Sequence, residues 1–218
     1  QPLASAHLMG LSAAWTAKLA AHSHTERQVL TVVRTVGGSP AFDLLMPGDI
    51  LLAIDGKVVT DFREVEQATA DRTQVQATIW RAGEHTLTVP TVVLSGAGLK
   101  RVVQWAGATL QAPFQAMRAQ RGIPPVGVYV DFFAYGSPAA RYGLFPGRRI
   151  VQVDGVPTPN LDTFLAAVAG RPDRSSVRLT TITWNNAPEV ITLKLDKHYW
   201  PAYELLRTPE GWTRRSLN

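Results

Sequence analysis

The sequence contains no cysteine, which excludes disulfide bonds, cysteine-ligated zinc or iron–sulfur sites and thiol chemistry. It has no apolar run of about 18 residues, so no segment is predicted to span a membrane. Charged residues make up only 18% of the 218 residues and hydrophobic residues 45%, a composition that supports packed cores and excludes bulk disorder. Because the first residue is Gln1 and not methionine, we expect a processed product or a fragment of a longer protein.

The two halves of the chain differ in charge. Residues 1–98 carry 7 basic and 9 acidic side chains, a balance of −2, whereas residues 99–218 carry 15 and 8, a balance of +7. The arginines of the second half are scattered and do not alternate with aromatic residues, as they would in a nucleic-acid groove. We therefore expect a solvated basic surface and no specific nucleic-acid partner.

A single pattern is repeated along the chain. The tetrapeptide Gly-Ser-Pro-Ala (GSPA) occurs at 38–41 and again at 136–139, an offset of 136 − 38 = 98 residues. Each copy continues with a Pro-Gly pair and an apolar stretch that ends at Asp-Gly, first at Asp55 and then at Asp154. Two copies at a nearly constant offset predict two domains of about 100 residues each. The expected divisions are a first domain at 1–97, a linker at Ser95–Gly98, a second domain at 99–200 and a C-terminal hairpin or extension at 201–218.

Both copies predict the same series of elements. A glycine loop at Gly10 or Gly107 precedes a helical stretch and a strand, and GSPA then begins a turn or short helix. After the Asp-Gly turn come an amphipathic helix, capped by Asp61 or Asn160, and a β-hairpin. The strands before GSPA are expected at 29–34 and 127–133. The predicted fold class is mainly β with short helices (α+β).

This order of elements resembles a PDZ domain, in the circularly permuted form found in HtrA/Deg-type serine proteases. The resemblance covers nearly the whole chain as a tandem pair. The segments GVYVDFFAYGSPAARYGLFPG and HYWPAYEL resemble the long multi-PDZ members of the Deg family, of the plant plastid and fungal nuclear kind, and bacterial relatives. The resemblance implies two consecutive PDZ-like, partly open β-barrels.

The resemblance also implies where a peptide binds. In a PDZ domain an extended peptide adds as a strand at a sheet edge, its carboxylate meets the N–H groups of a glycine loop, and its last side chain enters a pocket beside a helix. The implied carboxylate loops are Leu8, Met9, Gly10 and Leu11 in the first copy and Trp105, Ala106, Gly107 and Ala108 in the second. The implied groove residues are Phe62, Val65 and Thr69, and Leu161, Phe164 and Val168. Plain core packing is the competing interpretation for these helix residues.

The second copy departs from the pattern in two ways. Arg148 stands where the first copy has Asp49, and the glycine loop is flanked only by Ala106 and Ala108. Small flanking residues offer little apolar surface to a ligand. We therefore expect the first domain to be the better peptide receptor.

No residue set suited to catalysis or metal binding is found. The GSPA serines precede a proline and lack a histidine and aspartate placed to activate them, and no G-x-S-x-G occurs. His22-x-His24 lacks further ligands at suitable spacing and is typical of a solvated loop. The chain is thus expected to catalyse nothing and to need no cofactor or metal.

The resemblance implies that a trypsin-like endopeptidase domain lies upstream. The expected partners are that domain and the C-terminal or extended apolar segments of protein substrates, with any oligomer formed through the parent protein. If the protein is bacterial, the resemblance favours an extracytoplasmic, periplasmic location. Two alternatives stay open: the tandem PDZ region of a membrane-embedded metalloprotease, and a non-enzymatic PDZ scaffold. A full-length gene distinguishes them by a GNSGG-type serine motif, an H-E-x-x-H motif in a membrane span, or neither.

Overall fold

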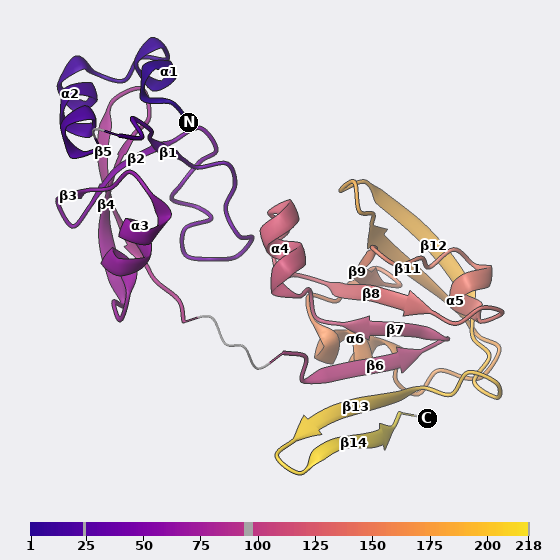
Figure 1. Ribbon diagram of the computed structural model, residues 1–218. Helices are drawn as coiled ribbons and strands as arrows, with labels where there is room; N and C mark the ends of the chain where they lie inside the picture. Colours follow the sequence, from indigo (N-terminus) through magenta and orange to yellow (C-terminus); the bar gives the residue numbers. More distant parts are fainter. Residues whose placement is uncertain (24, 94–97, 218) are drawn as a thin grey trace. The chain divides into compact units, whose positions relative to one another are not determined.

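The computed structural model describes residues 1–23, 25–93 and 98–217 (Figure 1). The chain divides into two compact units. Unit 1 comprises Gln1–Leu94 and Ala116–Pro124, and unit 2 comprises Ser95–Gln115 and Pro125–Asn218. The segment Ala116–Pro124 thus belongs to unit 1, although the repeat places it in the second half of the chain. Within unit 1, Nε of Arg118 donates a hydrogen bond to the carbonyl oxygen of Gly37 at 2.7 Å. Of the predicted linker, Ser95–Ala97 lies outside the described residues.

Unit 1 combines helices with a five-stranded antiparallel sheet of order β1-β2-β4-β5, in which β3 pairs with β2. Its strands are β1 (Leu30–Thr31), β2 (Ile50–Ile54), β3 (Lys57–Val58), β4 (Gln74–Trp80) and β5 (Glu84–Pro90). Its helices are α1 (Leu3–Leu8), α2 (Ala13–His22) and α3 (Phe62–Thr69). Helix α2 begins where the side chain of Ser12 accepts a hydrogen bond from the N–H of Trp15.

Unit 2 is built on a nine-stranded antiparallel sheet of order β12-β11-β9-β8-β7-β6-β13-β14, in which β10 pairs with β9. Its strands are β6 (Arg101–Trp105), β7 (Ala108–Gln111), β8 (Val128–Phe133), β9 (Arg149–Val153), β10 (Val156–Pro157), β11 (Ser176–Ile182), β12 (Pro188–Lys194), β13 (Tyr203–Thr208) and β14 (Gly211–Ser216). The helices in this part of the sequence are α4 (Gln115–Arg121), α5 (Pro138–Arg141) and α6 (Leu161–Val168).

The sequence repeat appears as a repeated set of elements. The series β1, β2, β3, α3, β4, β5 corresponds in order and pairing to β8, β9, β10, α6, β11, β12. In both sets Asp55 or Asp154 has a positive φ, of 48° or 49°, and the following glycine does too, which is the conformation of a tight hairpin turn. Both helices begin at a reciprocal capping box, formed by Asp61 in α3 and by Asn160 in α6.

One local expectation, the length of a strand, is corrected, and the expected turn or short helix at GSPA takes a different form in each unit. The strand predicted at 29–34 is reduced to β1, whereas the strand predicted at 127–133 is present as β8. GSPA forms the short helix α5 in unit 2, where Ser137 accepts a hydrogen bond from the N–H of Ala140, but only turns in unit 1. Strand β1 pairs with β2 through Leu30 and Thr31 only. The residue before it, Val29, instead exchanges backbone hydrogen bonds with Gln1.

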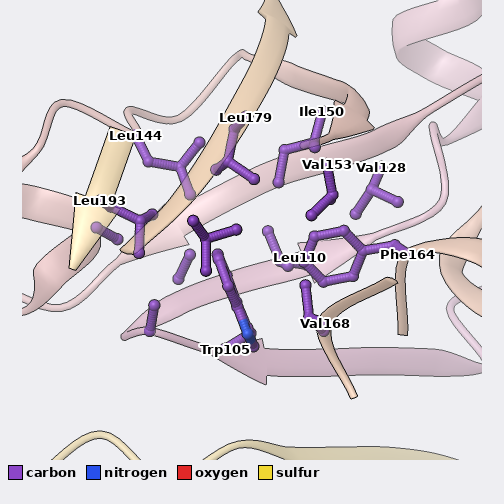
Figure 2. Close-up of a cluster of buried hydrophobic side chains, with 14 of the residues drawn as sticks. Trp105, Leu110, Val128, Leu144, Ile150, Val153, Phe164, Val168, Leu179 and Leu193 are labelled. Atoms are coloured by element: carbon purple, nitrogen blue, oxygen red, sulfur yellow. The ribbon is translucent and has the colours of Figure 1, made fainter. Parts of the chain in front are cut away.

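The two units build their cores differently. Unit 2 has one cluster of buried side chains, drawn in Figure 2, in which Trp105 meets Phe164 edge to face with ring centroids 5.2 Å apart. Unit 1 has two smaller clusters. One includes Leu11 and Trp15 from the α1–α2 region, and the other lies beneath α3 and includes Val75. Unit 2 therefore has one continuous core, in which the contact between Trp105 of β6 and Phe164 of α6 joins strand and helix.

We expect Phe164→Ala to lower the free energy of unfolding of unit 2 by about 3–5 kcal/mol, because it removes a fully buried ring and leaves a cavity. Chemical denaturation monitored by tryptophan fluorescence measures this. The matched control, Phe132→Ala, removes a ring that is 55% exposed and is expected to change stability far less. Equal losses in the two variants would contradict the central role of Phe164.

Candidate functional site

The glycine loop of unit 2 is a two-residue hairpin turn. Ala106 and Gly107 connect β6 to β7 with φ values of +52° and +79°, and Trp105 pairs with Ala108 on either side of the turn. The N–H groups of Ala139 and Ala134 donate hydrogen bonds to the carbonyl oxygens of Ala106 and Gly107 at 3.0 and 2.8 Å. The turn is thereby fixed against the GSPA segment.

Gly107 allows this close approach. A Cβ atom at this position would lie 2.1 Å from Cβ of Ser137, and φ is in the region that favours glycine. Ser137 is itself fully buried and caps α5. The glycine predicted to hold a peptide carboxylate thus also has a packing role.

The structure gathers the predicted site residues of unit 2 into one cluster. Trp105, Ala106 and Ala108 share the buried core with the three predicted residues of α6, which are Leu161, Phe164 and Val168. None of these α6 side chains is more than 8% exposed. They therefore pack as core residues in this structure, which was the competing interpretation of the sequence.

Strand β7 has no free edge. It pairs with β8 on one side and with β6 on the other. β6 therefore lies at the position beside β7 that an added peptide strand would take. Val103 and Trp105 of β6 project into the same cluster as Phe164.

The predicted glycine loop of unit 1 lies in a different structure. Leu8 is the last residue of α1, Met9 follows it, Gly10 has φ of +100°, and the chain continues into α2 and not into a strand. The N–H groups of Met9, Gly10 and Leu11 donate to carbonyl oxygens of α1, at 3.0 Å in each case. A predicted carboxylate role for this loop does not fit this hydrogen bonding, because these donors are already used.

Gly10 and Gly122 resemble each other locally, although the repeat pairs Gly10 with Gly107. Both Gly10 and Gly122 follow a short helix, have positive φ and precede a buried apolar residue, Leu11 or Ile123. By its place in the repeat, α2 corresponds to α4, because each is the last helix before the strand that precedes GSPA, β1 or β8.

Helix α3 is largely exposed to solvent. None of its eight residues is buried, and Phe62 is 77% exposed, while Val65 and Thr69 are half-buried. Val65 packs against the cluster beneath α3, whereas Leu11 belongs to the other cluster of unit 1. Unlike those of unit 2, the predicted loop and groove residues of unit 1 are therefore not gathered into one cluster.

An ion pair that the sequence did not reveal holds the Pro-Gly turn of unit 1. Asp49 is buried, and Arg81 donates to its two carboxylate oxygens at 2.7 and 2.5 Å. Burial alone would raise the pKa of Asp49, but the bonds from Arg81 and from the N–H of Met46 outweigh it and lower this pKa. In unit 2 the charge is reversed, since Arg148 occupies the position of Asp49 and pairs with Glu189 of β12.

A second ion-pair network joins the C-terminal hairpin to the rest of unit 2. Glu204 of β13 is fully buried, and its two carboxylate oxygens lie 3.0 Å from Nη2 of Arg101 and 2.6 Å from Nη2 of Arg215. Arg101 also contacts Asp162, in the first turn of α6, at 2.6 Å. Burying a carboxylate requires such partners, so β6, β13, β14 and α6 are held together by one charged centre.

Neither a metal-binding cluster nor a membrane-spanning helix is found among the described residues. Among the described residues no group of three or more histidine, aspartate or glutamate side chains is placed to hold a metal ion, and no helix is both long and apolar enough to cross a bilayer. His22 lies 2.5 Å from Glu64, and His24 lies outside the described residues.

Comparison with known families identifies the class. Residues 99–174 match the family model described as a PDZ-like domain. This part of the chain is therefore similar to PDZ-like domains, and the predicted fold class, mainly β with short helices in PDZ-like units, is confirmed.

Two similar full-length proteins are more informative than the family model. Protease Do-like 7 of Arabidopsis thaliana is 39% identical over 227 residues, which cover 99% of this chain and 21% of that protein. Pro-apoptotic serine protease nma111 of Aspergillus clavatus is 38% identical over 219 residues, 96% of this chain and 21% of that protein. The chain thus spans about a fifth of the length of these relatives, and they confirm the predicted resemblance to Deg-type serine proteases.

A solved structure is also similar. The HtrA-type protease AlgW with decapeptide covers 74% of this chain and 55% of its own, with a TM-score of 0.38 and 16% sequence identity.

The Asp49–Arg81 pair predicts a pH dependence for unit 1. Because the pKa of Asp49 is lower in the folded state than in the unfolded chain, its contribution to stability is complete above about pH 4, the unfolded value, and is lost as the pH falls through the folded pKa. Asp49→Asn should therefore be less stable than the parent near neutral pH, and the gap should narrow below about pH 4. The difference in unfolding temperature between the parent and Asp49→Asn, measured at several pH values above and below this point, tests the prediction. In the control Asp43→Asn, at an exposed carboxylate, any gap should stay small; a pH-independent gap for Asp49→Asn would contradict the prediction.

Proposed function

We propose that this chain is the peptide-binding PDZ-like region of a Deg-type serine endopeptidase, where it recognises extended apolar segments of protein substrates. The relatives, both serine or Do-like proteases by name, support the assignment to a serine protease over a metalloprotease or a scaffold protein. The catalytic domain belongs to the rest of such a protein. The chain itself contributes recognition, and no step of peptide hydrolysis is assigned to its residues.

The observation that carries the proposal is the contrast between two equivalent helices. In unit 2, Leu161, Phe164 and Val168 of α6 are already covered by β6 and its neighbours. In unit 1 no residue of α3 is buried, and Phe62 exposes most of its ring. Apolar surface that remains in water gains free energy when a ligand covers it. Unit 1 is therefore the proposed receptor, as the sequence predicted, with α3 as its contact surface.

The hydrogen bonds of the α1 terminus change the expected mode of recognition. Because the N–H groups at Met9, Gly10 and Leu11 are used within α1, a free peptide carboxylate has no donors to meet there. The side chains of Leu8 and Met9 are 87% and 64% exposed and are available for apolar contacts with a peptide. The flexible thioether of Met9 can adapt to different peptide side chains. Recognition by side chains suits internal extended segments as well as chain ends.

The test is a titration of the full 218-residue chain with a fluorescent peptide in which leucine and serine alternate. Phe62→Ala should weaken binding by roughly ten- to a hundredfold, the range expected for losing a buried aromatic contact. Because Phe62 is exposed, the substitution should leave thermal unfolding unchanged. Phe132→Ala, at an exposed phenylalanine of unit 2, is the matched control and should bind normally.

Amidating the peptide terminus separates the two modes of recognition. Equal binding of the amidated and free forms is expected if side chains dominate. The site on α3 would be wrong if Phe62→Ala bound as tightly as the parent. In the full-length protein, the same substitution should lower kcat/KM for substrates that carry such a segment and leave hydrolysis of a short chromogenic peptide unchanged.

A further inference from the structure

The sheet of unit 2 extends well beyond the strand at which a PDZ-type peptide would add. Beside β7 lies β6, beside β6 lies β13, and beside β13 lies β14 (Figure 1). Each pair is antiparallel and in regular register. Within the described residues, β14 pairs only with β13. The chain's own strands have therefore moved the edge of the sheet from β7 to β14.

The register shows which backbone groups of β14 face outward. Thr208 and Gly211 close a two-residue turn, and in an antiparallel hairpin such a closing pair exchanges hydrogen bonds, as does every second pair after it. The outward-facing groups therefore belong to Trp212, Arg214 and Ser216. The pattern agrees with the far side of β13, where the N–H of Arg207 donates to the carbonyl oxygen of Lys100 of unit 2 at 2.8 Å.

The side chains of this edge are basic and held in place. All six residues of β14 are exposed. The guanidinium of Arg214 lies over the ring of Tyr203 at 3.8 Å, and Arg215 contacts the buried Glu204 at 2.6 Å. Trp212 leaves half of its side chain in solvent. The edge thus combines free backbone groups, two ordered cations and one aromatic surface.

The charge of the edge selects its occupant. A second β14 strand would bring arginines close to arginines, and like charges on paired strands are destabilising. An incoming strand with carboxylates would instead form favourable cross-strand pairs. We propose that β14 is a strand-addition site for extended acidic segments of partner proteins. This site is separate from α3 and does not depend on the function proposed for unit 1.

The probe is a fluorescent, amidated peptide in which threonine and glutamate alternate, titrated into the full chain. Arg214→Pro removes one outward N–H without removing a bond to β13, and it should weaken binding by about tenfold. Arg214→Ala keeps the N–H and should weaken binding by up to about fivefold. The peptide in which lysine replaces glutamate should bind far more weakly, and added salt should reduce binding of the acidic form.

Amide hydrogen exchange tests the geometry without any substitution. On addition of the acidic peptide, the N–H groups of Trp212, Arg214 and Ser216 should become protected, while those of Thr213 and Arg215 should change little, because they already bond to β13. This alternation supports the proposal even if Arg214→Pro fails to fold.

Several results would overturn it. These are equal binding of the lysine and glutamate peptides, protection that does not alternate along β14, and loss of binding in Phe62→Ala but not in Arg214→Pro, which would place the peptide on α3. Concentration-dependent self-association in light scattering, with no peptide binding, would assign the edge to a second copy of the chain.

Discussion

The antiparallel pairing of β6 with β7 determines the character of unit 2. Because Ala106 and Gly107 turn the chain within two residues, β6 returns beside β7 and places Trp105 against Phe164. The three apolar residues of α6 are then buried by strands of the same chain. The sheet continues through β13 and β14 from the edge that this pairing creates. The predicted groove residues of α6 thus form part of the interior of unit 2.

Unit 1 shows what the same repeat becomes without that hairpin. It has no counterpart of β6, β13 or β14, and its sheet ends at β1 in the described part of the chain. Helix α2 packs beside α1 through Trp15 and Leu19 and adds a core cluster of its own. Helix α3 packs Val65 and Ala68 against the cluster that includes Val75, and none of its residues is buried. Similar sequences thus provide an exposed helix in one unit and a buried helix in the other.

Local signals made much of the fold predictable. Caps at Asp61 and Asn160, Asp-Gly turns and alternating strands gave the helices and hairpins of both units. The candidate site was harder, because Gly10 and Gly107 share apolar or small neighbours but lie in different elements. No neighbouring residue in the sequence indicates that Ala106 has a positive φ. The Arg101–Glu204 ion pair joins residues that are 103 positions apart in the sequence. Such contacts depend on tertiary packing, which periodicity does not encode.

The buried carboxylate of Glu204 bears on where this domain ends. The segment that matches the PDZ-like family stops at residue 174, yet the sheet takes four more strands from the sequence that follows. A chain shortened before β13 would leave β6 with an unpaired edge and Arg101 with Asp162 as its remaining ion-pair partner. Exposed edges of this kind invite pairing between molecules. The last two strands therefore cover the edge of β6, complete the ion pairs of Arg101 and replace the edge at β6 by the basic edge at β14.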